Sequence, residues 1–89
     1  MYIPKIKICG IKTLDIALLA CEYNADALGF IFYDKSPRFI DYTSAKDIIN
    51  KLPIFVKKVG VFVNHSLDEI IEIFYKTGID TIQLHGERS

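Results

Sequence analysis

The sequence has no excess of charge of either sign, because its 11 lysine and arginine residues balance 11 aspartate and glutamate residues. Proteins that bind nucleic acid or an anionic membrane surface usually carry net positive charge for that purpose. Neither partner is therefore expected. A small-molecule ligand is the expected partner instead.

Cysteine is scarce as well, since only Cys9 and Cys21 occur among the 89 residues. Small secreted domains depend on several spaced disulfides, and this sequence has no such set. The amino terminus has no apolar signal region followed by a small-residue cleavage site, and no apolar run approaches the length of a membrane span. We expect a soluble, cytoplasmic protein.

Motifs for metal and nucleotide binding are also missing. His65 and His85 have no metal-type spacing to each other or to a cysteine. There is no G-x-G-x-x-G sequence and no phosphate-loop motif. We predict no metal site.

What is present is a regular alternation of short apolar runs and helical stripes. The runs cover residues 5–9, 27–32, 58–63 and 81–84 and are typical of strands. Between them, stripes with i, i+3, i+4, i+7 spacing run from Leu14 to Cys21, from Ala45 to Leu52 and from Leu67 to Phe74. Strand and helix units that recur every ~20–30 residues predict parallel strands joined by right-handed crossovers. The predicted fold class is α/β.

Polar residues mark the expected ends of the helices. Ser66 and Glu69 have the spacing of a capping box. Weaker signals are the N-cap candidates Thr13 and Asp41 and the helix ends Asn24 and Gly78. An open doubly wound sheet and a closed eight-unit barrel both fit this order. A barrel needs about 250 residues, and only three and a half units are present here.

In either architecture, ligands bind where the strands end and the loops to the next helices converge. The candidates at this edge are Cys9 and Gly10, residues 33–38, Asn64 and His65, and residues 85–87. His65 directly precedes the capping serine, so we expect it to be exposed.

Cys9 ends an alternating run in which period two puts Lys7 and Cys9 on one face and Ile6 and Ile8 on the other. If helices bury the isoleucines, Lys7 and Cys9 point inward together. A neighbouring ammonium favours the thiolate, which acts as a base or nucleophile. A buried, inert thiol fits the same position equally well.

Arg38 closes the polar loop 34–38, and its bidentate fork suits a carboxylate or a phosphate. A solvated surface loop is the alternative. Gln83 and His85 share a strand face, where His85 is either a ligand contact or base or a satisfied structural residue. A thiol hydrolase pairing Cys9 with His85 would need the first and fourth strands to be neighbours. Cys21 lies on the apolar stripe of the first helix and is predicted to be core.

Five ordered segments resemble the phosphoribosylanthranilate isomerase family over essentially the whole chain. They are Lys7-Ile8-Cys9-Gly10-Ile11, Ala25-Asp26-Ala27-Leu28-Gly29-Phe30-Ile31-Phe32, Ser36-Pro37-Arg38, Val59-Gly60-Val61-Phe62-Val63-Asn64 and Ile82-Gln83-Leu84-His85-Gly86. The resemblance implies a single-domain (β/α)₈ barrel of the TIM type, of which residues 1–89 would be a truncated N-terminal half. It also implies an isomerase of tryptophan biosynthesis that uses no cofactor.

The resemblance implies a role for each matching residue. Cys9 would be the general base of an Amadori rearrangement of N-(5′-phosphoribosyl)anthranilate, and Arg38 would hold the anthranilate carboxylate. Gln83 and His85 would belong to the pocket wall. Our own inference is that Lys7 tunes the electric field at the site.

The general acid and the phosphate-binding loops of the family lie in the second half of the barrel. Asp26, Asp34 and Asp80 are not at the matching position for the acid. We therefore expect the chain to be inactive alone and to need a complementary C-terminal half-barrel.

Two alternatives remain at the level of sequence. A non-catalytic half-barrel could bind a partner or self-associate through unpaired strand edges. An open-sheet signalling or nucleotide-binding module would need an acidic cluster or glycine fingerprint that is missing here.

Overall fold

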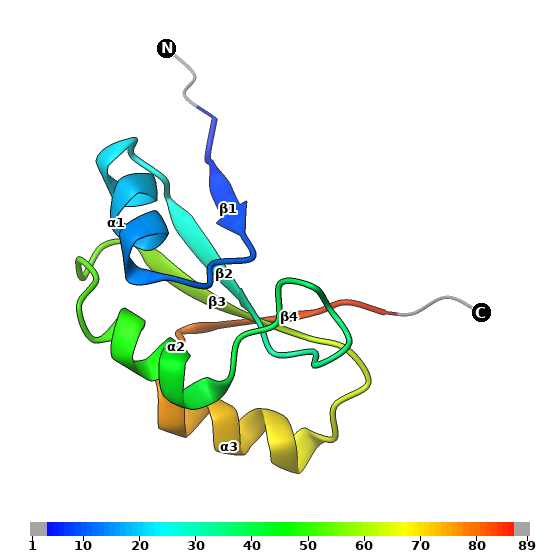
Figure 1. The fold of residues 1–89 in the computed structure, drawn as a ribbon. Coiled ribbons are helices and arrows are strands. Elements are labelled where there is room, and N and C mark those ends of the chain that lie inside the picture. Colours follow the sequence, from blue (N-terminus) through cyan, green and yellow to red (C-terminus); the bar gives the residue numbers. More distant parts are fainter. Residues whose placement is uncertain (1–3, 87–89) are drawn as a thin grey trace.

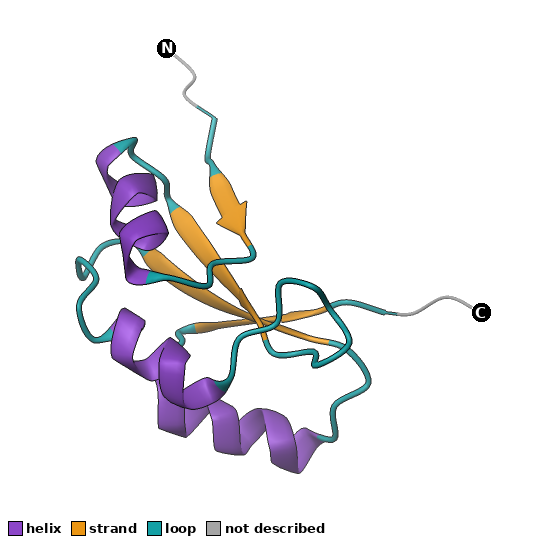
Figure 2. Cartoon of the chain, in the orientation of Figure 1, coloured by secondary structure: helices purple, strands orange, loops and turns teal. Residues whose placement is uncertain are grey.

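A computed structural model describes residues 4–86, in which strands and helices alternate along the chain (Figures 1 and 2). The elements are β1 (Lys7–Cys9), α1 (Leu14–Glu22), β2 (Ala27–Ile31), α2 (Tyr42–Ile49), β3 (Lys57–Phe62), α3 (Leu67–Thr77) and β4 (Thr81–Leu84). The order predicted from periodicity is confirmed. The main difference is that β1 begins at Lys7 and not at residue 5.

The strands form one parallel sheet in the order β1-β2-β3-β4. The helices lie together on one side of this sheet, and the other side carries no helix of the described chain (Figure 2). Because β2 and β3 separate β1 from β4, the first and fourth strands are not hydrogen-bonded neighbours, which argues against a thiol hydrolase that pairs Cys9 with His85.

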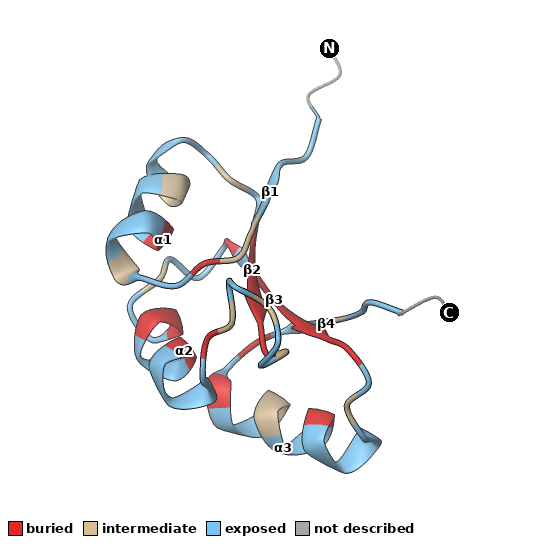
Figure 3. Ribbon diagram, turned by 45° about the vertical axis from the view of Figure 1, so that its right-hand side comes forward, coloured by how far each residue is buried: buried red, intermediate tan, exposed pale blue. Residues whose placement is uncertain are grey.

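Each face of the sheet has its own apolar cluster. Leu28 and Phe30 of β2 and Phe62 of β3 are fully buried between the sheet and the helices. Ile31 of β2 and Val59 of β3 belong to a smaller cluster on the helix-free face. Figure 3 shows both strands buried along most of their length. Their near-continuous apolar sequences follow from this burial on two sides.

The helix ends are those that the polar residues predicted. Thr13 caps α1 and Asp41 caps α2, each by accepting a hydrogen bond from a backbone amide three residues on. At α3, Ser66 and Glu69 form the complete capping box. α3 ends at Gly78, which has the left-handed backbone that favours glycine (φ 89°).

Two aspartates join the starts of neighbouring strands in the same way, one between β1 and β2 and the other between β3 and β4. Asp26, just before β2, accepts a hydrogen bond from Ile6 N at 2.6 Å and donates its own amide to Ile6 O at 2.8 Å. Asp80, just before β4, makes the same pair of bonds with Lys58 at 3.0 Å and 2.9 Å. We call these pairs the Asp26 clamp and the Asp80 clamp. They lie at the end of the sheet opposite to the predicted site.

Both outer strands retain exposed apolar side chains. Ile8 of β1 and Ile6 just before it face α1, as period two predicted, but they are only partly covered (39% and 47% exposed). At the other end of the sheet, Ile82 and Leu84 of β4 are also exposed. None of the described helices is long and apolar enough to cross a membrane.

Candidate active site

The loop between β2 and α2 folds back onto the carboxyl edge of the sheet. Phe39 forms a parallel bridge with Ile31, the last residue of β2, and Ile40 N donates to Ile31 O at 2.9 Å. Within the loop, Arg38 N donates to Ser36 Oγ at 3.1 Å. These bonds fix the backbone on both sides of Arg38 and direct its side chain toward the end of β1.

Arg38 lies over Gly10, the residue that follows β1. A Cβ at Gly10 would be 2.6 Å from Arg38 Cδ and 3.1 Å from Arg38 Nε, distances that normal packing does not allow. Gly10 also has a left-handed backbone (φ 89°). The structure therefore brings Arg38 next to the Cys9–Gly10 segment, although residues 10 and 38 are 28 positions apart in the sequence.

Cys9 depends on a second close approach to a glycine. A Cβ at Gly29 of β2 would be 2.9 Å from Cys9 Sγ. The thiol is half-buried and packs against the cluster of Ile31, Val59 and Val61 on the helix-free face. Cys9 therefore points to the inner side of the sheet, as its period-two position predicted.

Lys7 and Gln83 meet on this same inner face. Lys7 Nζ donates a hydrogen bond to Gln83 Oε1, although β1 and β4 are the two outer strands of the sheet. The bond thus passes over β2 and β3, whose inward residues here are the small Ala27 and Gly29 on β2 and Val59 and Val61 on β3. The sequence placed both side chains on inner strand faces but did not predict that they touch.

The two histidines have different environments. His65 was expected to be exposed, but it is half-buried. Its Nδ1 accepts from Val63 N at 3.0 Å, and its Nε2 lies 3.1 Å from Phe32 O. Since Nδ1 is an acceptor, Nε2 carries the proton and donates to Phe32 O. His65 therefore ties the end of β3 to that of β2. His85 is exposed at the end of β4, where its backbone amide donates to Phe62 O at 2.9 Å.

Two hollows open at the carboxyl edge of the sheet. One of about 480 Å³ lies between the loops that follow β2 and β3. Its lining includes Tyr33, Asp34, Lys35, Asn64, His65 and Glu69. A smaller one of about 210 Å³ is lined in part by His65, Leu84 and His85. Of the predicted candidates at this edge, only Glu87 lies outside the described residues.

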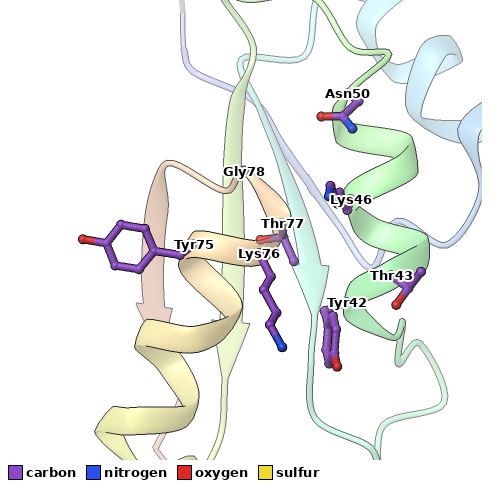
Figure 4. A pocket seen from close by; sticks show the side chains of 8 residues that line it. All are labelled: Tyr42, Thr43, Lys46, Asn50, Tyr75, Lys76, Thr77 and Gly78. Carbon is purple, nitrogen blue, oxygen red and sulfur yellow. The ribbon is translucent and has the colours of Figure 1, made fainter.

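A further hollow, of about 610 Å³, lies between α2 and α3 on the helix side of the sheet (Figure 4). There Lys76 points toward Tyr42, with its Nζ 5.1 Å from the ring centroid. Lys76 Nζ also lies 2.7 Å from Glu72 Oε2. This hydrogen bond and the negative charge of Glu72 raise the pKa of Lys76. The lining of this hollow between α2 and α3 contains none of the predicted site residues.

Cys21 is part of the helix-side packing, as predicted. It contacts the main core cluster from α1. Burial raises the pKa of its thiol, and the charge of Lys58 partly opposes that effect. A thiol with a raised pKa is a poorer nucleophile near neutral pH. Among residues 4–86, no three His, Cys, Asp or Glu side chains are grouped as a metal site would require.

The sequence model of the N-(5′-phosphoribosyl)anthranilate (PRA) isomerase family matches residues 6–89. The chain belongs to this family. Among curated PRA isomerases, that of Citrifermentans bemidjiense is 54% identical over 96% of this chain and 41% of its own length. That of Thermotoga neapolitana is 47% identical over 96% of this chain and 42% of its own. The chain thus spans about two fifths of the length of these PRA isomerases.

Solved PRA isomerase structures have the same fold over this region. The Thermotoga maritima enzyme superimposes with a TM-score of 0.93 at 44% identity, over 98% of this chain and 42% of that chain. The Thermus thermophilus enzyme gives a TM-score of 0.91 at 38% identity, over 97% and 43%. A PRA isomerase in complex with reduced 1-(o-carboxyphenylamino)-1-deoxyribulose 5-phosphate also matches, with a TM-score of 0.93 at 44% identity. It covers 98% of this chain and 45% of that one. The described β/α units therefore match the N-terminal part of the PRA isomerase barrel.

Proposed function

We propose that this chain forms the N-terminal part of a PRA isomerase barrel and supplies one side of its active site. The observation that carries the proposal is the position of Arg38 over Gly10, next to Cys9. A thiol base and a carboxylate-binding guanidinium then stand together at the carboxyl edge of the sheet, where barrel enzymes have their active sites.

The proposed reaction converts N-(5′-phosphoribosyl)anthranilate into 1-(2-carboxyphenylamino)-1-deoxyribulose 5-phosphate. A general acid protonates the ring oxygen of the sugar, the ring opens to a Schiff base, and a general base removes the proton from the second sugar carbon. The enolamine that forms then accepts a proton at the first sugar carbon and becomes the ketone. Because oxidation of one carbon balances reduction of its neighbour, no external cofactor takes part.

Each predicted side chain has a place in this scheme. The Cys9 thiolate is the base, and Arg38 binds the anthranilate carboxylate through its two parallel donors. Lys7 and Gln83, joined by their hydrogen bond, form the inner wall below Cys9. Lys7 adds a positive charge there, and His85 lies at the rim. The general acid and the phosphate-binding loops come from a complementary C-terminal half-barrel.

A partner of this kind suits both ends of the sheet. Within residues 4–86, β1 and β4 each pair with one neighbour only. Ile6 and Ile8 are exposed beside one edge, and Ile82 and Leu84 beside the other. Burial of such side chains typically contributes about 1.5–3 kcal/mol each. These edges also support the second candidate function, a non-catalytic half-barrel that self-associates.

The deciding experiment measures isomerase turnover by the purified chain, alone and mixed with a separately produced C-terminal half-barrel. We expect turnover only in the mixture. Cys9→Ala should reduce kcat about 10²–10⁴-fold, the usual contribution of a general base. Cys21→Ala is the matched control, because it removes the chain's other cysteine from the helix side, and it should retain turnover.

A companion measurement addresses the carboxylate site in the same mixture. Arg38→Met should raise KM roughly 10–100-fold, because a charge-assisted hydrogen bond contributes about 1.5–3 kcal/mol. Lys51→Met, which removes an exposed charge after α2 and away from the candidate site, should change KM little. If the folded, assembled mixture shows no isomerase turnover and the chain alone forms a stable oligomer, the self-associating half-barrel is favoured.

A further inference from the structure

We propose that Gly10 is a positioning residue of this site, because the space left by its missing side chain allows Arg38 to lie beside Cys9. This inference deepens the proposed function and rests on Arg38 as the carboxylate-binding group. It assigns Gly10 a task beyond that of a flexible turn residue.

The first argument is the place where a side chain at residue 10 would meet Arg38. A Cβ there would lie 2.6 Å from Cδ, 3.1 Å from Nε and 3.3 Å from Cβ of Arg38. The contact therefore involves the stem of the arginine from its base to the start of the guanidinium. A small rotation of the tip alone cannot relieve it.

The second argument is that neither backbone is free to move aside. Gly10 N and Ile11 N both donate to Gly29 O, each at 3.0 Å, which fixes residue 10 against β2. On the other side, Phe39 forms a bridge with Ile31 and Ile40 N donates to Ile31 O at 2.9 Å, which holds the chain next to Arg38 against β2. The arginine side chain is thus the part that must swing away when residue 10 gains a Cβ. The positive charge at the Cys9–Gly10 segment then leaves with it.

The consequence can be measured on the chain itself through the reactivity of Cys9. Iodoacetate carries a carboxylate and iodoacetamide does not, but both alkylate the same thiolate. A guanidinium held beside Cys9 attracts the carboxylate reagent, so the ratio of the two alkylation rates reports the position of Arg38. All variants carry Cys21→Ala so that Cys9 is the only thiol.

We expect Arg38→Met to lower the iodoacetate-to-iodoacetamide rate ratio several-fold, because a unit charge within a few ångströms of the thiol changes the local concentration of an anionic reagent by that order even in water. Gly10→Ala should lower the ratio to a similar extent while Arg38 is still present. Gly78→Ala is the matched control for backbone strain, because Gly78 has the same φ of 89° and lies at the end of α3. It should leave the ratio unchanged.

Circular dichroism before alkylation establishes that each variant is folded. If Gly10→Ala is not folded, Gly10→Asn takes its place, because asparagine tolerates left-handed backbone and carries the same Cβ. An unchanged ratio in the folded Gly10 variant would overturn the proposal, and so would an unchanged ratio in Arg38→Met. Since the readout needs no turnover, failure of the isomerase assay and failure of this proposal remain distinguishable.

Discussion

The thiol of Cys9 lies against the bare backbone of Gly29, in the space that a side chain there would occupy. A Cβ at Gly29 would be 2.9 Å from Cys9 Sγ and 3.2 Å from Cys9 Cα. The two residues are also direct partners in the pairing of β1 with β2. The missing side chain of Gly29 on the neighbouring strand therefore sets the position of the proposed base.

Gly29→Ala should destabilise the chain by about 1–3 kcal/mol, the usual cost of an added methyl group in a tightly packed position. The contact includes Cys9 Cα, so β1 itself must shift and not only the thiol. Urea unfolding measures the loss. Gly86→Ala is the control, because a Cβ there would meet nothing within 4 Å. Equal stability of the two variants would contradict the close approach.

Asp26→Ala and Asp80→Ala should each lower the free energy of unfolding by about 1–3 kcal/mol, because each leaves a backbone amide, of Ile6 or of Lys58, without its acceptor. Asp26→Asn and Asp80→Asn keep an acceptor oxygen and should cost less. The measurement is again urea unfolding. The exposed Asp47 on α2 provides the control, and its change to alanine should have little effect. A loss for Asp47→Ala as large as for the clamp residues would argue against the clamps.

Acid should weaken the helix caps. Hydrogen bonds from the backbone amide and hydroxyl of Ser44 lower the pKa of Asp41, and those of Ser66 lower the pKa of Glu69. A lowered folded pKa means that the stabilisation is fully present above the unfolded pKa values, about 3.9 and 4.3. It is then lost as the pH falls through the folded values.

The double variant Asp41→Asn, Glu69→Gln should therefore lose less stability between about pH 6 and about pH 3 than the unchanged chain, because its caps do not titrate. Thermal unfolding followed by circular dichroism across this range is the measurement. Parallel curves for the two proteins would show that the caps contribute nothing to the acid response.

His65→Ala should destabilise the chain by about 1–3 kcal/mol, because Val63 N loses its acceptor and Phe32 O its donor. His85→Ala is the natural comparison, since it removes the chain's other histidine from an exposed position. It should change stability by less than about 0.5 kcal/mol. The opposite ranking in urea unfolding would contradict the structural role of His65.

Most of the fold could be predicted from the sequence because its signals are local. Apolar periodicity located the strands and helices, and the hydroxyl and carboxylate of Ser66 and Glu69 located the start of α3. The start of β1 was placed too early because period two continues through residue 5, while the ladder begins only at Lys7. A sequence pattern does not show where a neighbouring strand stops pairing.

The site was predicted less completely because its geometry depends on contacts between distant segments. Cys9 and Arg38 were predicted to be site residues from strand ends and from family resemblance, but nothing in their spacing indicated that Arg38 would lie over Gly10. The contact of Lys7 with Gln83 depends on how far the sheet curves. His65 was expected to be exposed because the sequence does not show that β2 offers it the carbonyl of Phe32.

The two aspartate clamps also bear on how the polypeptide acquires its structure. Each clamp closes a segment of one strand, one helix and the start of the next strand, and its partners are 20 positions apart in one clamp and 22 in the other. The entropy of closing so short a loop is modest, and no other strand is needed to form it. One such segment can therefore be joined at its base while later strands are still being synthesised. The loops at the other end of the strands, where we propose that the site lies, take no part in either clamp.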